Sequence, residues 1–280
     1  MSSVVCGVCF RHCNIKEGSL GFCGARTCKD DKVTCANYGK VTSLALDPIE
    51  KKPLARFFPG SLILSVGSYG CNLRCPFCQN NEISWGPEAC EHVRGAEIIS
   101  PEELAATAEY YKDEGNIGVA FTYNEPLIGY EYVRDAAKLV HERGMKNVIV
   151  TNGTACLGVL DELVPYVDAM NIDLKGFSDQ YYSKFLGGDR EMVMDFIKAA
   201  VKLCHVELTT LIIPGENDSE EEMSALSEWI AGLDADIPLH VTRFFPCFHM
   251  TDRGPTAVDS VIHLADVARQ NLKYVYTGNI

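Results

Sequence analysis

The sequence contains no hydrophobic run near the length of a membrane-spanning helix. About 20 consecutive apolar residues are needed to cross a bilayer, and no stretch of the 280 residues approaches that length. The amino-terminal stretch Met-Ser-Ser-Val-Val-Cys also lacks the charged segment and following apolar segment that are typical of a secretory signal. We therefore expect no membrane association and a cytoplasmic protein.

Positive charge is scarce relative to negative charge. The chain has 25 Lys and Arg against 38 Asp and Glu, which gives a formal net charge of -13. Nonspecific attraction to nucleic acid or to an anionic membrane surface depends on positive charge. The composition therefore argues against nucleic acid as a partner.

Low-complexity tracts and long linkers are absent too, so the chain is expected to fold throughout. Seven apolar runs alternate with amphipathic segments, which predicts an α/β fold with functional residues at the carboxyl ends of the strands. The pattern fits a full or partial (β/α) barrel, and an open doubly wound sheet is the alternative. The expected strands cover 62–66, 117–121, 147–150, 169–172, 206–213, 239–244 and 273–276, and the expected helices 100–114, 127–143, 157–164, 178–186, 191–203, 219–233 and 258–271.

Cysteine, by contrast, is abundant. The chain has 13 cysteines, six of which lie in residues 1–35. In a reducing compartment, clustered cysteines are metal ligands or redox groups more often than disulfides. Residues 1–60 have nine Lys and Arg against five Asp and Glu, a net charge of +4 that would offset metal-bound thiolates. We predict an amino-terminal Cys-rich module at 1–60, with a short hairpin formed by 33–38 and 41–46, and a barrel domain at 61–280.

A second set of cysteines directly follows the first barrel strand, in the segment Cys71-Asn-Leu-Arg-Cys75-Pro-Phe-Cys78. Three thiolates in one loop are one ligand short of a closed zinc site. An iron–sulfur cluster held by three cysteines would keep one iron open to an outside ligand. The alternative is a zinc loop completed by Cys90 or by a distant cysteine.

This spacing, Cys-x3-Cys-x2-Cys with aromatic Phe77 before the last cysteine, resembles the signature of the radical S-adenosylmethionine (SAM) superfamily. The resemblance extends over residues 60–276. It implies a partial (β/α)6-type barrel, with a [4Fe-4S] cluster on Cys71, Cys75 and Cys78 whose open iron binds SAM. It also implies anaerobic chemistry in which reductive cleavage of SAM yields a 5′-deoxyadenosyl radical that abstracts hydrogen from a substrate.

The segment Phe-Thr-Tyr-Asn-Glu-Pro at 121–126 resembles the family's Gly-Gly-Glu-Pro-like segment, which contacts the SAM amino group. Tyr123 and Asn124 replace the glycines. Glu125 keeps the carboxylate, which can accept hydrogen bonds from an ammonium. The alternative is that Glu125 only caps the helix that begins near Leu127.

Three later segments resemble the glycyl-radical activating enzymes. In those enzymes, residues around the SAM carboxylate and ribose correspond to Thr151 and Asn152 here and, further along the chain, to Asp173 and Lys175. Val150 replaces the first aspartate of that pattern. Lys175 could neutralise the carboxylate, or it could simply pair with Asp173 at the surface. His249 lies in a segment where activases place a histidine near SAM, so Lys175 and His249 are the candidate catalytic residues. A lone histidine is otherwise often a structural hydrogen-bond donor.

The amino-terminal cysteines have the spacing Cys6-x2-Cys9-x3-Cys13-x9-Cys23. Four thiols fit a structural zinc site, which we favour, or a second iron–sulfur cluster. A reduced segment without metal is the third alternative, but this stretch has few apolar residues with which to fold. Together with the motifs above, this spacing resembles the AmmeMemoRadiSam family, whose members are often described as pyruvate formate-lyase activating enzyme homologues.

We therefore expect a radical SAM enzyme that receives electrons from a low-potential donor of the ferredoxin or flavodoxin type and acts on a protein or a small molecule. Activation of a glycyl-radical protein is the first alternative. A noncatalytic electron carrier or zinc scaffold is an alternative from another class. It would explain the cysteines but not Glu125, Asp173, Lys175 and His249.

Overall fold

A computed structural model describes residues 3–280, apart from the side chains of Cys90 and Val93. The zinc loop completed by Cys90 therefore lies outside the described residues. The molecule is built on one eight-stranded sheet in the order β14-β13-β12-β11-β10-β9-β7-β6. Its strands are β6 (Ser43–Pro48), β7 (Leu62–Gly67), β9 (Asn116–Phe121), β10 (Lys146–Thr151), β11 (Ala169–Asp173), β12 (His205–Ile212), β13 (Leu239–Arg243) and β14 (Val275–Gly278).

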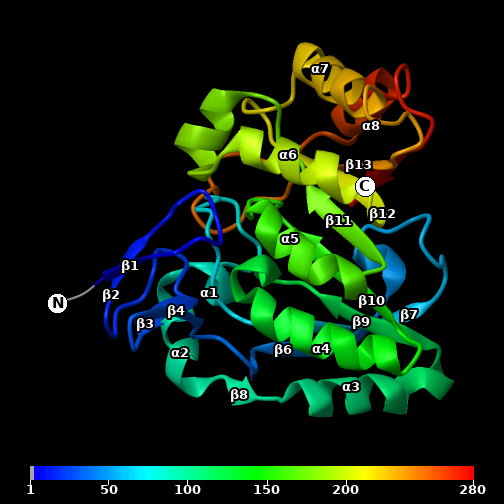
Figure 1. Cartoon of the computed structure of the whole chain (residues 1–280). Helices are drawn as coiled ribbons and strands as arrows, with labels where there is room; N and C mark the ends of the chain where they lie inside the picture. Colours follow the sequence, from blue (N-terminus) through cyan, green and yellow to red (C-terminus); the bar gives the residue numbers. More distant parts are fainter. Residues whose placement is uncertain (1–2) are drawn as a thin grey trace.

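Helices cover the outer face of this curved sheet and follow one another in chain order from α3 (Pro101–Tyr110) to α8 (Val258–Ala268) (Figure 1). The helix α3 begins with a complete capping box, in which Ser100 and Glu103 each accept a backbone N–H of the other. A short π-helix, Tyr181–Leu186, replaces the α-helix expected at 178–186. The α-helices are α1 (Asn81–Ser84), α2 (His92–Gly95), α3 (Pro101–Tyr110), α4 (Tyr130–Glu142), α5 (Leu157–Leu163), α6 (Arg190–Ala200), α7 (Glu220–Ala231) and α8 (Val258–Ala268).

The sheet is a partial barrel, as predicted. Neighbouring strands from β7 to β14 pair in parallel, and β6 pairs antiparallel with β7. The end strands β6 and β14 are not neighbours in the described sheet, so the barrel stays open between them. Parallel strands buried on both faces have nearly continuous apolar runs, which is why sequence reasoning found all seven of them.

The hairpin predicted from residues 33–38 and 41–46 is wrong. The strand β4 (Lys32–Cys35) pairs with β3 (Arg26–Lys29), and β5 (Lys40–Val41) pairs with β8 (Glu97–Ile98). The strand β6 instead joins the barrel, where Leu46 lies opposite Leu64. Alternation identifies a strand but not its partner, and the free edge of β7 offers β6 six residue pairs.

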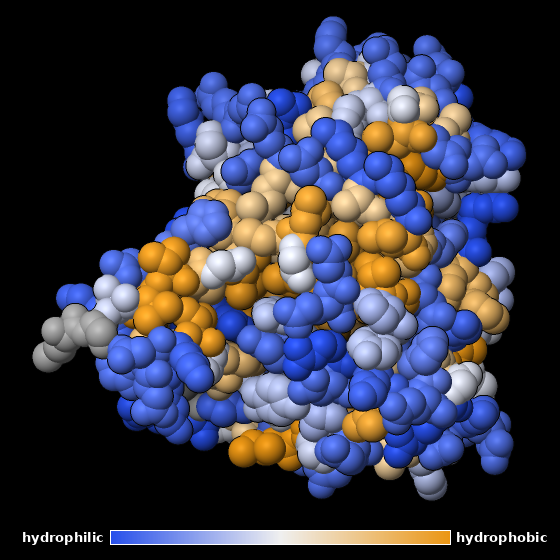
Figure 2. Space-filling model, in the orientation of Figure 1, coloured by the Kyte–Doolittle hydropathy of each residue, from blue (hydrophilic) through white to orange (hydrophobic). Residues whose placement is uncertain are grey.

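The Cys-rich segment packs directly on the barrel. Cys6, Val8, Ile15 and Cys28 are buried in the same apolar core as the barrel strands and helices. Its first strands, β1 (Ser3–Val5) and β2 (Asn14–Lys16), form a small antiparallel ribbon. Hydrophobic side chains gather over β1 on the face shown in Figure 2, where Val5 is exposed. Because β6 lies within residues 1–60, the barrel sheet begins before residue 61; the division into two domains stays a prediction.

A buried carboxylate of the sheet binds the backbone of the segment 49–58 and holds this segment against the sheet. Glu207, in β12, is fully buried and accepts hydrogen bonds from the backbone N–H groups of Ala55 (2.9 Å) and Arg56 (2.8 Å). The rings of His205 and His240 lie 2.9 and 2.7 Å from its two oxygens. Burial alone would raise the pKa of Glu207, but these hydrogen bonds lower it from about 4.5 to about 2.

Glu207→Gln is expected to lower the free energy of unfolding at pH 7 by about 3 kcal/mol, because the folded state holds the ionised carboxylate more favourably than the unfolded chain does. The wild-type contribution is complete above the unfolded pKa and is lost as pH falls from about 4.5 towards about 2. Urea unfolding measured from pH 7 to pH 3 checks this. Glu220→Gln removes an exposed Glu–His pair (2.7 Å) and serves as the matched control. A pH dependence identical in the Glu207 variant and the wild type would contradict the prediction.

Candidate active site

A cleft of about 760 Å³ opens at the carboxyl ends of the barrel strands. Cys71, Cys75 and Cys78, in the loop that follows β7, line it together with residues that follow β9, β10 and β11. The strand order brings these loops to one edge of the sheet, as expected for a parallel α/β fold. The structure thus brings together the three cysteines and most of the predicted site residues.

The cysteine loop is held on its outer side by residues 245–250. The thiol of Cys247 donates a hydrogen bond to the carbonyl oxygen of Phe77 (3.0 Å). The backbone N–H of His249 donates a hydrogen bond to the carbonyl oxygen of Pro76 (2.9 Å). The exposed ring of His249 lies against Trp85, with ring centres 5.6 Å apart, and does not line the cleft. Phe77 does line it and is buried. The structure therefore places His249 behind the loop rather than in the cleft wall.

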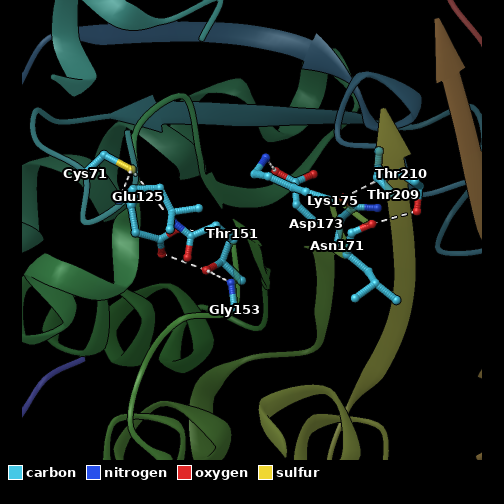
Figure 3. A network of polar contacts seen from close by, with 12 residues as sticks. Cys71, Glu125, Thr151, Gly153, Asn171, Asp173, Lys175, Thr209 and Thr210 are labelled. Carbon is cyan, nitrogen blue, oxygen red and sulfur yellow. Dashed lines mark hydrogen bonds and ion pairs between the residues drawn. The ribbon is translucent and has the colours of Figure 1, made fainter. Parts of the chain in front are cut away.

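Glu125 is the buried centre of a polar network in the cleft wall (Figure 3). Its carboxylate accepts hydrogen bonds from the hydroxyl of Thr151 (2.7 Å) and from the backbone N–H groups of Asn152 (2.8 Å) and Leu127 (3.0 Å). The last contact caps the short helix at Pro126–Gly129, so the alternative role that the sequence suggested is present. Burial raises the pKa of Glu125 to about 7, even though these hydrogen bonds act to lower it. A cation beside this carboxylate would stabilise its ionised form.

Tyr123 takes up a left-handed backbone conformation, with a φ of 71°, that ordinarily favours glycine. Its hydroxyl donates a hydrogen bond to Asp47 (2.8 Å), and its ring lies 4.7 Å from the ammonium of Lys52. Asp47 also binds that ammonium at 2.9 Å. Asn124 joins the loop after β9 to the loop after β7, since its side-chain oxygen accepts a hydrogen bond from the backbone N–H of Ser68 (3.0 Å). These contacts hold non-glycine residues where the family pattern has glycines.

Asp173 and Lys175 form a second polar group that is separate from the Glu125 network in Figure 3. Their side chains make an ion pair of 2.6 Å, and both line the cleft. Burial acts to lower the pKa of Lys175, but the charges of Asp173 and Cys75 outweigh it and raise this pKa. The pairing that the sequence left as an alternative is therefore present, although in the cleft wall and not at the open surface, and Lys175 stays protonated within the pair.

The four amino-terminal cysteines also come together. Cys6, Cys9, Cys13 and Cys23 line one small cavity of about 10 Å³. Cys6, Cys9 and Cys23 are buried, and burial raises the pKa of Cys9 to about 11. Throughout residues 3–280, no three Cys, His, Asp or Glu side chains converge in the way that one metal ion requires. Every cysteine whose side chain the structure describes is a free thiol.

Residues 65–226 match the family model described as the radical SAM superfamily. The chain belongs to the radical SAM superfamily. It is also 40% identical to protein MJ0808 of Methanocaldococcus jannaschii, over the whole of this chain and 82% of that protein. The pyruvate formate-lyase-activating enzyme of Clostridium pasteurianum is 29% identical over 59% of this chain and 67% of its own length. In structure, a radical SAM methyltransferase from Sphaerobacter thermophilus matches with a TM-score of 0.60 and 18% identity, over 79% of this chain and 67% of that chain.

Membership of the radical SAM superfamily makes the protein an enzyme that uses a [4Fe-4S] cluster and SAM, and the cleft suits both. Each cysteine of such a cluster binds a different iron, so the thiols need not converge on one point. Burial raises the pKa of Cys71 and Cys75, so both thiols must release protons when they bind iron. Among the described cysteines, only Cys71, Cys75 and Cys78 line the cleft. Three cysteine ligands would leave the fourth iron of a [4Fe-4S] cluster open to SAM.

Two features of the radical SAM site escaped sequence reasoning. Asn72 lies inside the cysteine motif, yet its side chain reaches Asn152 (3.0 Å) and Thr154 (3.0 Å) beyond β10. Asp47 and Lys52 come from outside the barrel motifs and support Tyr123. Neither a buried asparagine nor an isolated Asp-Lys pair has a residue spacing by which it could be identified in a sequence. Tyr123 stands where the family pattern has glycine, so its backbone was expected to need a positive φ. This was the one signal in the sequence that the tyrosine side chain needs supporting contacts.

Proposed function

We propose that Cys71, Cys75 and Cys78 hold the cluster at which this enzyme cleaves SAM reductively. The 5′-deoxyadenosyl radical so formed abstracts hydrogen from a substrate bound in the same cleft. One observation carries the proposal: three thiols, a buried carboxylate and a lysine line a single cleft at the strand ends. A noncatalytic electron carrier or a zinc scaffold would not need Glu125 and Lys175 in that cleft.

The cleft residues divide the binding of SAM among them. Glu125 would accept hydrogen bonds from the amino group of SAM, and Lys175 would pair with the SAM carboxylate. Asp173 holds the ammonium of Lys175 through their ion pair. Asn152 links the two sides of the site, since its amide lies 3.7 Å from the sulfur of Cys71 and its backbone N–H reaches Glu125. The remaining cofactor-binding residues are Phe77, Tyr123, Asn124 and Thr151, which line the cleft. The catalytic role of His249 stays a prediction without support from its position.

Activation of a glycyl-radical protein is the second candidate function. It is favoured by the similarity to the pyruvate formate-lyase-activating enzyme over 59% of the chain. In the cleft, Val150 stands where the activase pattern has aspartate, which argues against the same cation requirement. Capture of a protein substrate, as opposed to turnover of a small molecule, separates the two functions.

We extend the proposal to the setting of the reaction. A donor of the ferredoxin or flavodoxin type supplies the electron. The reaction is anaerobic, and the protein acts in the cytoplasm. None of the described helices is both long and apolar enough to cross a membrane. The four amino-terminal cysteines bind a metal centre, either zinc or a second cluster, that orders their segment.

Anaerobically reconstituted protein, mixed with SAM and dithionite, is expected to release 5′-deoxyadenosine and methionine in equal amounts. The reason is that one electron cleaves one sulfonium bond. Liquid chromatography with mass detection checks this, and reactions without reductant or without reconstitution are the controls. Protein that carries a full cluster at Cys71, Cys75 and Cys78 but yields no 5′-deoxyadenosine would contradict the proposed function.

A further inference from the structure

The four amino-terminal cysteines line one small cavity. The cavity lined by Cys6, Cys9, Cys13 and Cys23 has about 10 Å³, which is roughly the room one water molecule needs. No three of these thiols converge on one point in residues 3–280. Each sulfur of an iron–sulfur cluster binds a different iron, so four thiols that do not converge on one point suit a cluster.

The wall of this cavity also contains an unused donor. Arg26 is 4% exposed, and its Nη1 binds Glu131 (2.6 Å), but its Nε–H has no partner. Arg26 and Arg11 line the cavity with the four cysteines. A buried N–H without a partner is costly, and the sulfurs of an anionic cluster would accept it. Two guanidinium groups would also offset the negative charge of four thiolates.

This cysteine set touches the loop that holds the catalytic cluster. The backbone N–H of Cys71 donates a hydrogen bond to the carbonyl oxygen of Cys23 (3.2 Å). Asn72, the residue next to Cys71, lines the same cavity as Cys9. Gly70 permits the approach: its φ is +94°, and a Cβ there would lie 2.5 Å from the Cys23 oxygen. One hydrogen bond therefore separates a ligand residue of one centre from a ligand residue of the other.

We propose that Cys6, Cys9, Cys13 and Cys23 hold a second iron–sulfur cluster that passes electrons to the cluster at Cys71, Cys75 and Cys78. The inference rests on the proposed function for the role of the receiving cluster. One electron leaves a reduced low-potential flavodoxin or ferredoxin and reduces the amino-terminal cluster by one. The same electron then moves to the catalytic cluster, which returns the amino-terminal cluster to its oxidised state. No bond or proton is exchanged.

Metal content tests the site first. Wild-type protein reconstituted anaerobically is expected to contain about eight irons per chain, four for each cluster. The C71A/C75A/C78A variant and Cys9→Ser should each retain about four. The triple variant should also give an EPR signal on reduction with dithionite. Cys35→Ser, whose thiol lies outside the cavity and near Asn37 (3.0 Å), is the matched control and should keep both clusters. One zinc per chain in the wild type, or a triple variant without iron, would overturn the site.

Reduction kinetics test the relay. In Cys9→Ser, reduced flavodoxin is expected to reduce the cluster at Cys71 more slowly by an order of magnitude or more, while titanium(III) citrate reduces it at the wild-type rate. In the triple variant, flavodoxin should still reduce the remaining cluster, which keeps the test valid if Cys9→Ser does not fold. Equal flavodoxin rates in Cys9→Ser and wild type, or a triple variant that flavodoxin cannot reduce, would overturn the relay. Failure of the proposed function is distinct, since it appears as wild-type protein that releases no 5′-deoxyadenosine with dithionite.

Discussion

Alanine at Cys71, Cys75 or Cys78 is expected to reduce SAM cleavage below detection. In the proposed catalytic cluster each thiolate binds one iron, and the loop between β7 and α1 places all three thiols in the cleft. The cleft offers no other described cysteine as a replacement ligand. Measurement of 5′-deoxyadenosine, together with iron analysis, checks the result, and the iron content should fall by about four per chain.

Cys204→Ala is the control for these variants. Cys204 lies beyond α6, where its thiol points towards the Ala200 carbonyl oxygen (3.8 Å), and it does not line the cleft. Its removal should leave iron content and SAM cleavage intact. If any single alanine variant in the loop still cleaved SAM at the wild-type rate, the assignment of that cysteine as a cluster ligand would be wrong.

Glu125→Gln is expected to weaken SAM binding by about 1.5–3 kcal/mol, since a charge-assisted hydrogen bond to the SAM amino group is lost. This corresponds to a rise in Kd of roughly tenfold or more. The glutamine amide would also face the N–H of Asn152 or the hydroxyl of Thr151, which donate to the carboxylate in the wild type. Calorimetric titration of the oxidised, reconstituted protein with SAM gives the affinity.

Thermal unfolding of the same variant separates the two roles of Glu125. The carboxylate caps the helix at Pro126–Gly129, so a lower Tm is expected whether or not it binds SAM. Lys175→Met supplies the comparison from the other polar group of the cleft, because it removes the charge that we propose pairs with the SAM carboxylate. A Glu125 variant with a lower Tm and unchanged SAM affinity would leave capping as its role and remove it from the SAM site.

The sequence indicated the barrel and the catalytic loop but not the contacts between distant segments. The barrel strands were predictable because they are buried on both faces, and the site residues because strand ends share an edge of the sheet. The partner of β6 was not predictable, since alternation is the same for a hairpin and for an edge strand. The contact between Cys23 and Cys71 depends on backbone atoms at Gly70, which leave no mark on side-chain patterning.

The incomplete closure of the barrel decides what the wall of the cleft is made of on one side. Residues of the two end strands, Pro48 in β6 and Tyr276 in β14, line the same cleft as the cysteines. The segment that follows β6 also forms part of this wall, since Glu50, Pro53 and Ala55 line the cleft and Arg56 lies over the ring of Tyr274 (3.7 Å). This part of the wall is held by side chains such as that of Glu207 and not by strand pairing. The cleft can therefore change its shape on this side without breaking a strand pair of the sheet.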